Sequence, residues 1–156
     1  MRCLAAAPIL ALVWVGSANA TEAADRQSVE TFVAGFVDEV NKGDTKAALG
    51  RLATDVSIAE DLAPFHWKGP QAGADWLTGM QKNGERLGMT DIQMRLGAPI
   101  QVLVHGATAY EAIPGVVTLT GKRRKLRERG MLTFTLARQA GAWKITSLAW
   151  GGAAAK

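Results

Sequence analysis

The stretch Val29–Val56, VETFVAGFVDEVNKGDTKAALGRLATDV, decides how this chain folds. Apolar residues recur in its first half at steps of three and one, which places them on one stripe of an amphipathic helix. Gly43 is suited to the left-handed conformation that ends such a helix, and Asp44 can cap a short helix after it. We therefore expect two helices that meet at a corner and share a core. Their apolar residues are Val29, Phe32, Val33, Phe36, Val37 and Val40 in the first helix, and Ala48, Leu49 and Leu52 in the second.

A third helix and then a sheet are predicted downstream of this corner. Gly69-Pro70 marks the start of the helix, because proline is favoured in a first helical turn, and Gly88 follows its end. From Thr90 onward the apolar residues recur at every second position, as in strands. Further strands are expected at about 108–120, 127–138 and 142–150, joined by short turns that favour antiparallel neighbours. Gly97-Ala98-Pro99 and Pro114-Gly115 predict bends or bulges in this sheet.

The composition fits one domain preceded by a targeting segment. The chain has 156 residues, of which 48% are hydrophobic, enough for a single core. Arg2, the apolar residues 4–15 and Ala18-Asn19-Ala20 follow the pattern of a secretory signal peptide over residues 1–20. We expect cleavage after Ala20, one domain over residues 21–156, and a periplasmic or secreted protein. The alternative is a membrane anchor, but the apolar run is shorter than the ~20 residues that span a bilayer, and no other segment predicts a transmembrane helix.

Metal and cofactor sites are not expected from the residue types present. Cys3 is the only cysteine, and it lies within the predicted signal peptide. His66 and His105 are the only histidines, and no ligand spacing joins them to a cluster of carboxylates. We therefore predict no metal, no cofactor and no disulfide in the mature domain.

Several motifs give the chain a family resemblance. Asn41-Lys42-Gly43-Asp44, followed by Thr54-Asp55-Val56, is similar to the N-x-G-D…D-D-V segment of the NTF2-like superfamily, which includes SnoaL-like cyclases and ketosteroid isomerases. Ala142–Ile145 and Trp150 resemble the last strand of that superfamily, and Asp61–Pro70 resembles a bacterial branch called nuclear transport factor 2 family proteins. The resemblance implies an α+β cone, in which three N-terminal helices pack on a strongly curved mixed or antiparallel sheet and enclose a pocket. It also implies a homodimer.

The resemblance places candidate catalytic groups as well. In ketosteroid isomerases a carboxylate base moves a proton, while a Tyr and a protonated Asp hydrogen-bond the enolate oxygen. The base position falls on Glu60, whereas the Tyr position falls on Phe36 and the Asp position falls near Leu132, both apolar. Without these donors a true ketosteroid isomerase is not expected. Whether the chain is an enzyme stays open; if it is one, we expect an isomerase-, lyase- or hydrolase-like acid–base catalyst.

Glu60 and His66 are the two candidate catalytic residues. Glu60 and Asp61 are neighbouring carboxylates that can raise each other's pKa, but adjacent strand residues point to opposite faces, so only one enters a pocket. We choose Glu60. His66 precedes the third helix, where it could rim a cavity and shuttle protons near neutral pH. The alternatives are a solvated strand end for the two acids and a hydrogen-bonded surface histidine for His66.

Further residues are candidates for the pocket lining. Large aromatic side chains would suit a flat apolar ligand, although as core residues they need no ligand. On the strand near 128–136, a glutamate shares one face with apolar residues and can lie at the pocket mouth. The candidate lining residues are Asp61, Trp67, Tyr110, Glu128, Leu132, Phe134 and Trp150.

One dense charge run, Lys122–Arg129, lies at a predicted hairpin tip. Exposed cations there are usually solvated and keep a strand edge from pairing with another chain. The functional alternative is contact with an anionic membrane surface. Nucleic acid is not expected as a partner, because no aromatic residues are interleaved with this run.

The sequence thus predicts an exported protein with an apolar pocket that binds a small hydrophobic molecule and can transform it by acid–base chemistry. The alternative is a non-catalytic, dimeric interaction module whose cavity is filled by side chains. The size of the cavity separates the two, since ligand pockets have volumes of roughly 300 Å³ or more.

Overall fold

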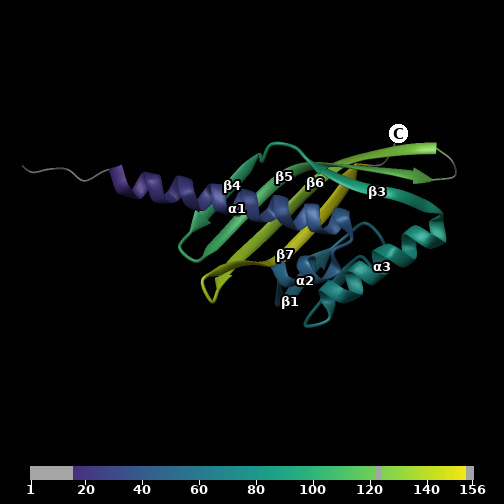
Figure 1. Ribbon diagram of the computed structural model, residues 1–156, viewed down its shortest axis with the longest axis horizontal. Helices are drawn as coiled ribbons and strands as arrows, with labels where there is room; N and C mark the ends of the chain where they lie inside the picture. Colours follow the sequence, from purple (N-terminus) through teal and green to yellow (C-terminus); the bar gives the residue numbers. More distant parts are fainter. Residues whose placement is uncertain (1–15, 122–123, 154–156) are drawn as a thin grey trace, which may run out of the picture.

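The computed structural model describes residues 16–121 and 124–153, with side chains from residue 22 onward. Within these ranges three helices pack against one open, seven-stranded mixed sheet, which confirms the predicted α+β class. Figure 1 shows α1 lying across the sheet, with α2 and α3 near the C-terminal end of α1. The helices are α1 (Gly16–Lys42), α2 (Thr45–Arg51) and α3 (Ala72–Leu87), and the strands are β1 (Leu52–Ala59), β2 (His66–Lys68), β3 (Met89–Leu96), β4 (Gln101–His105), β5 (Thr108–Gly121), β6 (Arg124–Gln139) and β7 (Ala142–Ala153).

The sheet has the strand order β2-β1-β7-β6-β5-β3, and β4 pairs with β5 as well. β5 and β6 form a long antiparallel hairpin whose register is unbroken from Thr108, opposite Ala137, to Gly121, opposite Arg124. β7 continues this meander as predicted. β1 pairs with β7 in parallel, which makes the sheet mixed.

The corner between α1 and α2 forms as the sequence predicts. Gly43 has a φ of 70°, and Asp44 caps α2 by accepting a hydrogen bond of 3.0 Å from the backbone N–H of Ala47. Asn41 fixes this corner to β3: its Nδ2 donates to the Met94 carbonyl at 2.7 Å, and its Oδ1 accepts from the Met94 N–H at 2.8 Å. The Asn41 side chain thus bonds to the edge of β3 as a neighbouring strand would.

Arg51, the last residue of α2, fastens this helix to α1. Its Nε and Nη2 each donate to the Glu39 carboxylate at 2.6 Å, and its Nη1 donates to the Phe32 carbonyl at 3.1 Å. Gly35 leaves the space for this guanidinium, because a Cβ at that position would lie 2.7 Å from Arg51 Nη2. The angle between the two helices is therefore held by paired, directional bonds.

The third helix differs from the prediction at its start and agrees at its end. Gly69-Pro70 lies in a turn, and α3 begins only at Ala72. Gly88 has a φ of 62° and ends the helix, as expected of a left-handed cap. Trp76 is buried and Leu77 and Met80 pack against the core, as the apolar stripe of this helix predicts.

The two predicted interruptions of the sheet have different outcomes. At Gly97-Ala98-Pro99 the chain leaves the sheet, so β3 and β4 pair with successive parts of β5. Of the bend or bulge that the sequence predicts at Pro114-Gly115, the bulge is absent, since the register between β5 and β6 is continuous there. Pro114 has no N–H to donate, and it faces the gap between β3 and β4, where its carbonyl accepts a 2.8 Å bond from Gly97.

Glycines form a row across the sheet where Trp150 packs against it. Gly130 of β6 is directly opposite both Gly115 of β5 and Gly152 of β7. A Cβ on Gly115 would lie 3.0 Å from the Trp150 ring, and one on Gly130 would lie 2.5 Å from it. Gly115 therefore makes room for an indole ring, which is a different role from the bulge that the sequence predicts.

Part of the N-terminal prediction lies outside the described residues. This applies to residues 1–15, with most of the predicted signal peptide, and to Lys122 and Arg123 of the charge run. α1 begins at Gly16 and continues through the predicted cleavage point after Ala20. Across residues 16–121 and 124–153, no helix has the length and apolar character needed to cross a membrane.

A Gly130→Ala substitution tests the glycine row. A methyl group would also lie 2.5 Å from the Gly151 carbonyl oxygen, so backbone must shift, and we expect a loss of about 2 kcal/mol or more in the free energy of unfolding. Urea unfolding measures this loss. Gly50→Ala in α2 is the matched control: its Cβ would meet nothing within 4 Å, so it should stabilise the protein by about 0.5–1 kcal/mol. Equal midpoints for the two variants would contradict a close Trp150–Gly130 contact.

Candidate functional site

A cavity of about 430 Å³ lies between the helices and the inner face of the sheet. Apolar side chains of α1, α3 and four strands (β3, β5, β6 and β7) make up most of its wall. Glu60 is the one ionisable residue among those that line it. The lining residues are Phe36, Val37, Val40, Asn41, Gly43, Thr45, Glu60, Trp76, Leu77, Met80, Gln81, Ile92, Met94, Val117, Leu132, Phe134, Leu148 and Trp150.

Glu60 follows β1 directly, and the strand end aims this residue at the cavity. Its backbone N–H donates to the Phe65 carbonyl at 3.1 Å, which closes the loop before β2. Burial, together with the negative charges of Asp61 and Glu128, raises the pKa of Glu60 from 4.5 to about 7. Among the described residues, no group hydrogen-bonds its buried Oε2 atom. Near neutral pH this carboxyl is therefore present in both its protonated and its ionised form.

Asp61 and Glu128 are two further acids that lie beside Glu60. A Cβ on Gly152 would lie 2.8 Å from both Asp61 Oδ2 and the Glu128 carboxyl carbon, so the glycine row ends where these side chains meet. Burial and the Asp61 carboxylate raise the pKa of Glu128, while a hydrogen bond with Trp150 lowers it. Neither acid lines the cavity itself; both lie next to its single ionisable residue.

Three further residues expected at the pocket lie elsewhere. His66 is exposed, and its Nε2 lies 2.9 Å from Ser57 Oγ, so it hydrogen-bonds on the surface instead of rimming the cavity. Trp67 is a buried core residue that packs over Gly79 of α3. Tyr110 alternates with the buried Ala109 and Glu111 on β5 and so lies on the opposite face of the sheet.

Leu132, Phe134 and Trp150 do line the cavity. Phe36, and Leu132 near the second of the two donor positions that the family resemblance implies, also lie in the wall. Trp76 and Met80 of α3 are lining residues that sequence reasoning treated as core. Their signal was present in the apolar stripe of α3, but a stripe does not distinguish a filled core from a cavity wall.

The sequence analysis missed Glu111, a buried carboxyl of the kind often found at functional sites. It is fully buried on the inner face of β5, opposite Val102 of β4 and Phe134 of β6. Both of its carboxyl oxygens are without a hydrogen-bond partner among the described residues. Burial, and to a lesser extent the charge of Glu30, raises the pKa of Glu111 to about 7. The sequence could have indicated this position, because Glu111 lies two residues from both Ala109 and Ile113 on the strand and so faces inward as they do.

Comparisons with solved structures show which class of fold this is. A crystal structure of an NTF2-like protein with a cystatin-like fold from Novosphingobium aromaticivorans aligns with a TM-score of 0.70 and 19% identity, covering 90% of each chain. A putative scytalone dehydratase from the same species has a TM-score of 0.73 and 11% identity, over 88% of this chain and 90% of that one. Hexachlorocyclohexane dehydrochlorinase LinA-type3 from Novosphingobium barchaimii has a TM-score of 0.69 and 14% identity, over 88% and 92% of the two chains.

The chain therefore has the NTF2-like fold, as its motifs predict. No protein-family model and no curated protein matches the sequence. At these identities the likeness concerns the fold, which other proteins use for different functions.

The raised pKa values of Glu60 and Glu111 predict an unusual pH dependence of stability. A carboxyl with a raised folded pKa holds its proton more tightly in the folded state, so folding should weaken as pH rises from about 4.5 to about 7. Glu111→Gln removes one such group. When the pH is raised from 5 to 8, the free energy of unfolding of this variant should therefore fall by about 1–3 kcal/mol less than that of the wild type. Urea unfolding at both pH values measures this difference. Glu85→Gln, at an exposed site on α3, is the control: it should change the free energy of unfolding by the same small amount at both pH values. An unchanged pH dependence in Glu111→Gln would show that Glu111 is not buried as a neutral acid.

Proposed function

We propose that this protein binds a small hydrophobic molecule in the cavity and that Glu60 acts on it as a general acid or base. The observation that carries the proposal is a single carboxyl, with a pKa raised to about 7, in the wall of an otherwise largely apolar cavity of about 430 Å³. This volume lies in the range of known ligand pockets, which favours the pocket protein over the filled interaction module.

The chemistry available to Glu60 is proton transfer. Its ionised form can accept a proton from a carbon or oxygen atom of the ligand, and its protonated form can return that proton to another atom. A pKa near the working pH keeps both forms populated, which is what a residue that alternates between the two roles requires. Two of the structures with this fold are described as a dehydratase and a dehydrochlorinase, so the fold supports enzymes.

The absence of a donor at Phe36 and Leu132 limits the reaction type. Stabilising a full enolate charge requires strong donors aimed at the oxygen, and neither of these side chains supplies one. We therefore infer an isomerase-, lyase- or hydrolase-like reaction on a substrate that does not depend on an oxyanion hole of the ketosteroid isomerase type.

A titration with the neutral apolar dye N-phenylnaphthylamine tests both parts of the proposal. Binding an apolar molecule removes more water from Glu60, so the wild type should bind the dye at pH 6 about threefold or more tightly than at pH 8. Glu60→Gln has no charge to bury, and its affinity should not change over this range. Met80→Trp fills part of the cavity and should weaken binding about tenfold at both pH values.

Matched variants separate these effects from general ones. Glu85→Gln should keep the wild-type pH profile, and Leu103→Trp, on an exposed position of β4, should keep the wild-type affinity. If Leu103→Trp weakens binding as much as Met80→Trp does, the dye is not in the cavity. If the wild type binds no dye at all, the non-catalytic, dimeric interaction module is the better description.

We also propose that the protein is exported and acts in the periplasm or outside the cell. The support is the succession of Arg2, the apolar residues 4–15 and Ala18-Asn19-Ala20. Mass spectrometry of protein recovered from a periplasmic extract should give a chain that begins at Thr21. A chain that retains residues 1–20 in that extract would contradict cleavage after Ala20.

A further inference from the structure

Three cations of the charge run lie on one face of the sheet. On β6, Lys125, Arg127 and Arg129 are directly opposite Thr120, Thr118 and Val116 of β5. Because side chains alternate along a strand, these cations share one face, while Glu128 belongs to the inner face with the acids beside Glu60. Lys122 and Arg123 lie outside the described residues, and nothing below depends on them.

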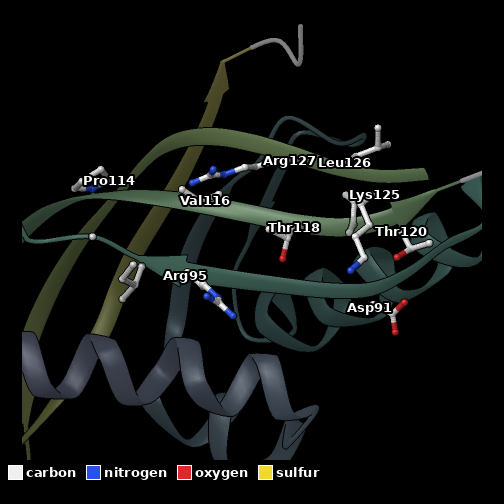
Figure 2. A pocket seen from close by; sticks show the side chains of 12 residues that line it. Asp91, Arg95, Pro114, Val116, Thr118, Thr120, Lys125, Leu126 and Arg127 are labelled. Carbon is white, nitrogen blue, oxygen red and sulfur yellow. The ribbon is translucent and has the colours of Figure 1, made fainter. Parts of the chain in front are cut away.

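A third strand brings another cation to this outer face. Arg95 of β3 is directly opposite Val116 of β5, and Gln93 is opposite Thr118. The result is a groove of about 780 Å³ over β3, β5 and β6, in which Figure 2 shows Arg95 near Val116, and Lys125 with Thr120 at the other end. Its lining residues are Asp91, Arg95, Leu96, Gly97, Pro114, Val116, Thr118, Leu119, Thr120, Lys125, Leu126 and Arg127.

The cations of this groove form no ion pair in the part of the chain that the structure describes. The four ion pairs found there join Arg26, Lys42, Arg51 and Arg138 to acids, and none involves Arg95, Lys125 or Arg127. Thr118 and Thr120 supply hydroxyl groups between the cations, and Thr118 Oγ1 itself donates to the Gln93 carbonyl at 3.4 Å. Guanidinium, ammonium and hydroxyl groups in this arrangement are the donors that recognise the oxygens of a phosphate group.

The groove is also partly apolar, which distinguishes its ligand from a free inorganic ion. Leu96, Leu119 and Leu126 also line it, but they alternate with the cations along their strands and belong to the inner face. Pro114 and Val116 contribute apolar surface on the outer face, beside the cations. A hydrated inorganic anion would leave these surfaces in contact with water. A phosphate group attached to glycerol and acyl chains would cover them and the cations at once.

We propose that this outer groove binds the phosphate group of an anionic phospholipid and so holds the protein on a bilayer surface. The site is separate from the Glu60 cavity, which lies on the inner face of the same strands. Asp91 is the one acid in the wall and lies at the Thr120 end, opposite the Arg95 end. The phosphate therefore binds between Arg95 and Arg127, away from this carboxylate.

Sedimentation of the full chain with lipid vesicles tests the proposal. The vesicles contain phosphatidylcholine with about one third phosphatidylglycerol, and vesicles of phosphatidylcholine alone measure any charge-independent binding through the apolar residues 4–15. Each basic residue near an anionic surface contributes a factor of about five in affinity, so the double variant Arg95→Gln/Arg127→Gln should lose about 20- to 30-fold. Asp91→Asn should bind more tightly than the wild type.

The control variant Lys82→Gln/Arg86→Gln removes the same charge from exposed positions on α3 and should bind the vesicles within about twofold of the wild type. Equal losses in the two double variants would show that net charge, and not the groove, attracts the protein. Binding that millimolar inorganic phosphate abolishes at constant ionic strength would assign the groove to a soluble phosphate and overturn the bilayer proposal. Circular dichroism and urea midpoints check that all variants are folded.

Discussion

The close approach of Trp150 to the sheet is the contact on which the site depends. Gly115 and Gly130 lie opposite one another beneath the indole ring, and Gly152 extends the same row to β7. A side chain at either of the first two positions would push the ring away from the sheet and into the space that forms the cavity. At the third position it would displace the carboxyl groups of Glu128 and Asp61. The absence of Cβ atoms along one row thus sets both the depth of the cavity and the position of the acids beside it.

The charged groups near the cavity illustrate how burial and repulsion act together. Glu60 loses water contact on entering an apolar wall, and two further carboxyl groups stand close to it, so its proton is held more tightly for both reasons. Glu111 shows the same effect with one neighbouring acid and complete burial. The fold bears an energetic cost for each of these acids when ionised, and such costs are characteristic of functional positions more often than of purely structural ones.

The sequence predicts the fold through features that act locally. The stripe of α1, the left-handed Gly43, the Asp44 cap and the Gly88 helix end each depend on a few neighbouring residues, and each is found as predicted. The site depends on pairings between distant segments, and here prediction is weaker. Glu60 could be placed through the motif at Asn41–Asp44, but His66, Trp67 and Tyr110 do not line the cavity. For His66 the alternative of a hydrogen-bonded surface histidine is the one found. The direction of a side chain follows from strand register, and register is decided by partners far away in the sequence. The same holds for Gly115, whose role appears only when Trp150 is seen above it.

The parallel pairing of β1 with β7 joins the first strand of the chain to the last. β2 pairs with one edge of residues 52–59, but their other edge gains its hydrogen-bonded neighbour only when residues 142–153 are in place. Contacts between such distant segments require the closure of a long loop before they contribute any stability, and they slow folding. During synthesis, the sheet on this side of the cavity can be completed only after the final strand has been made.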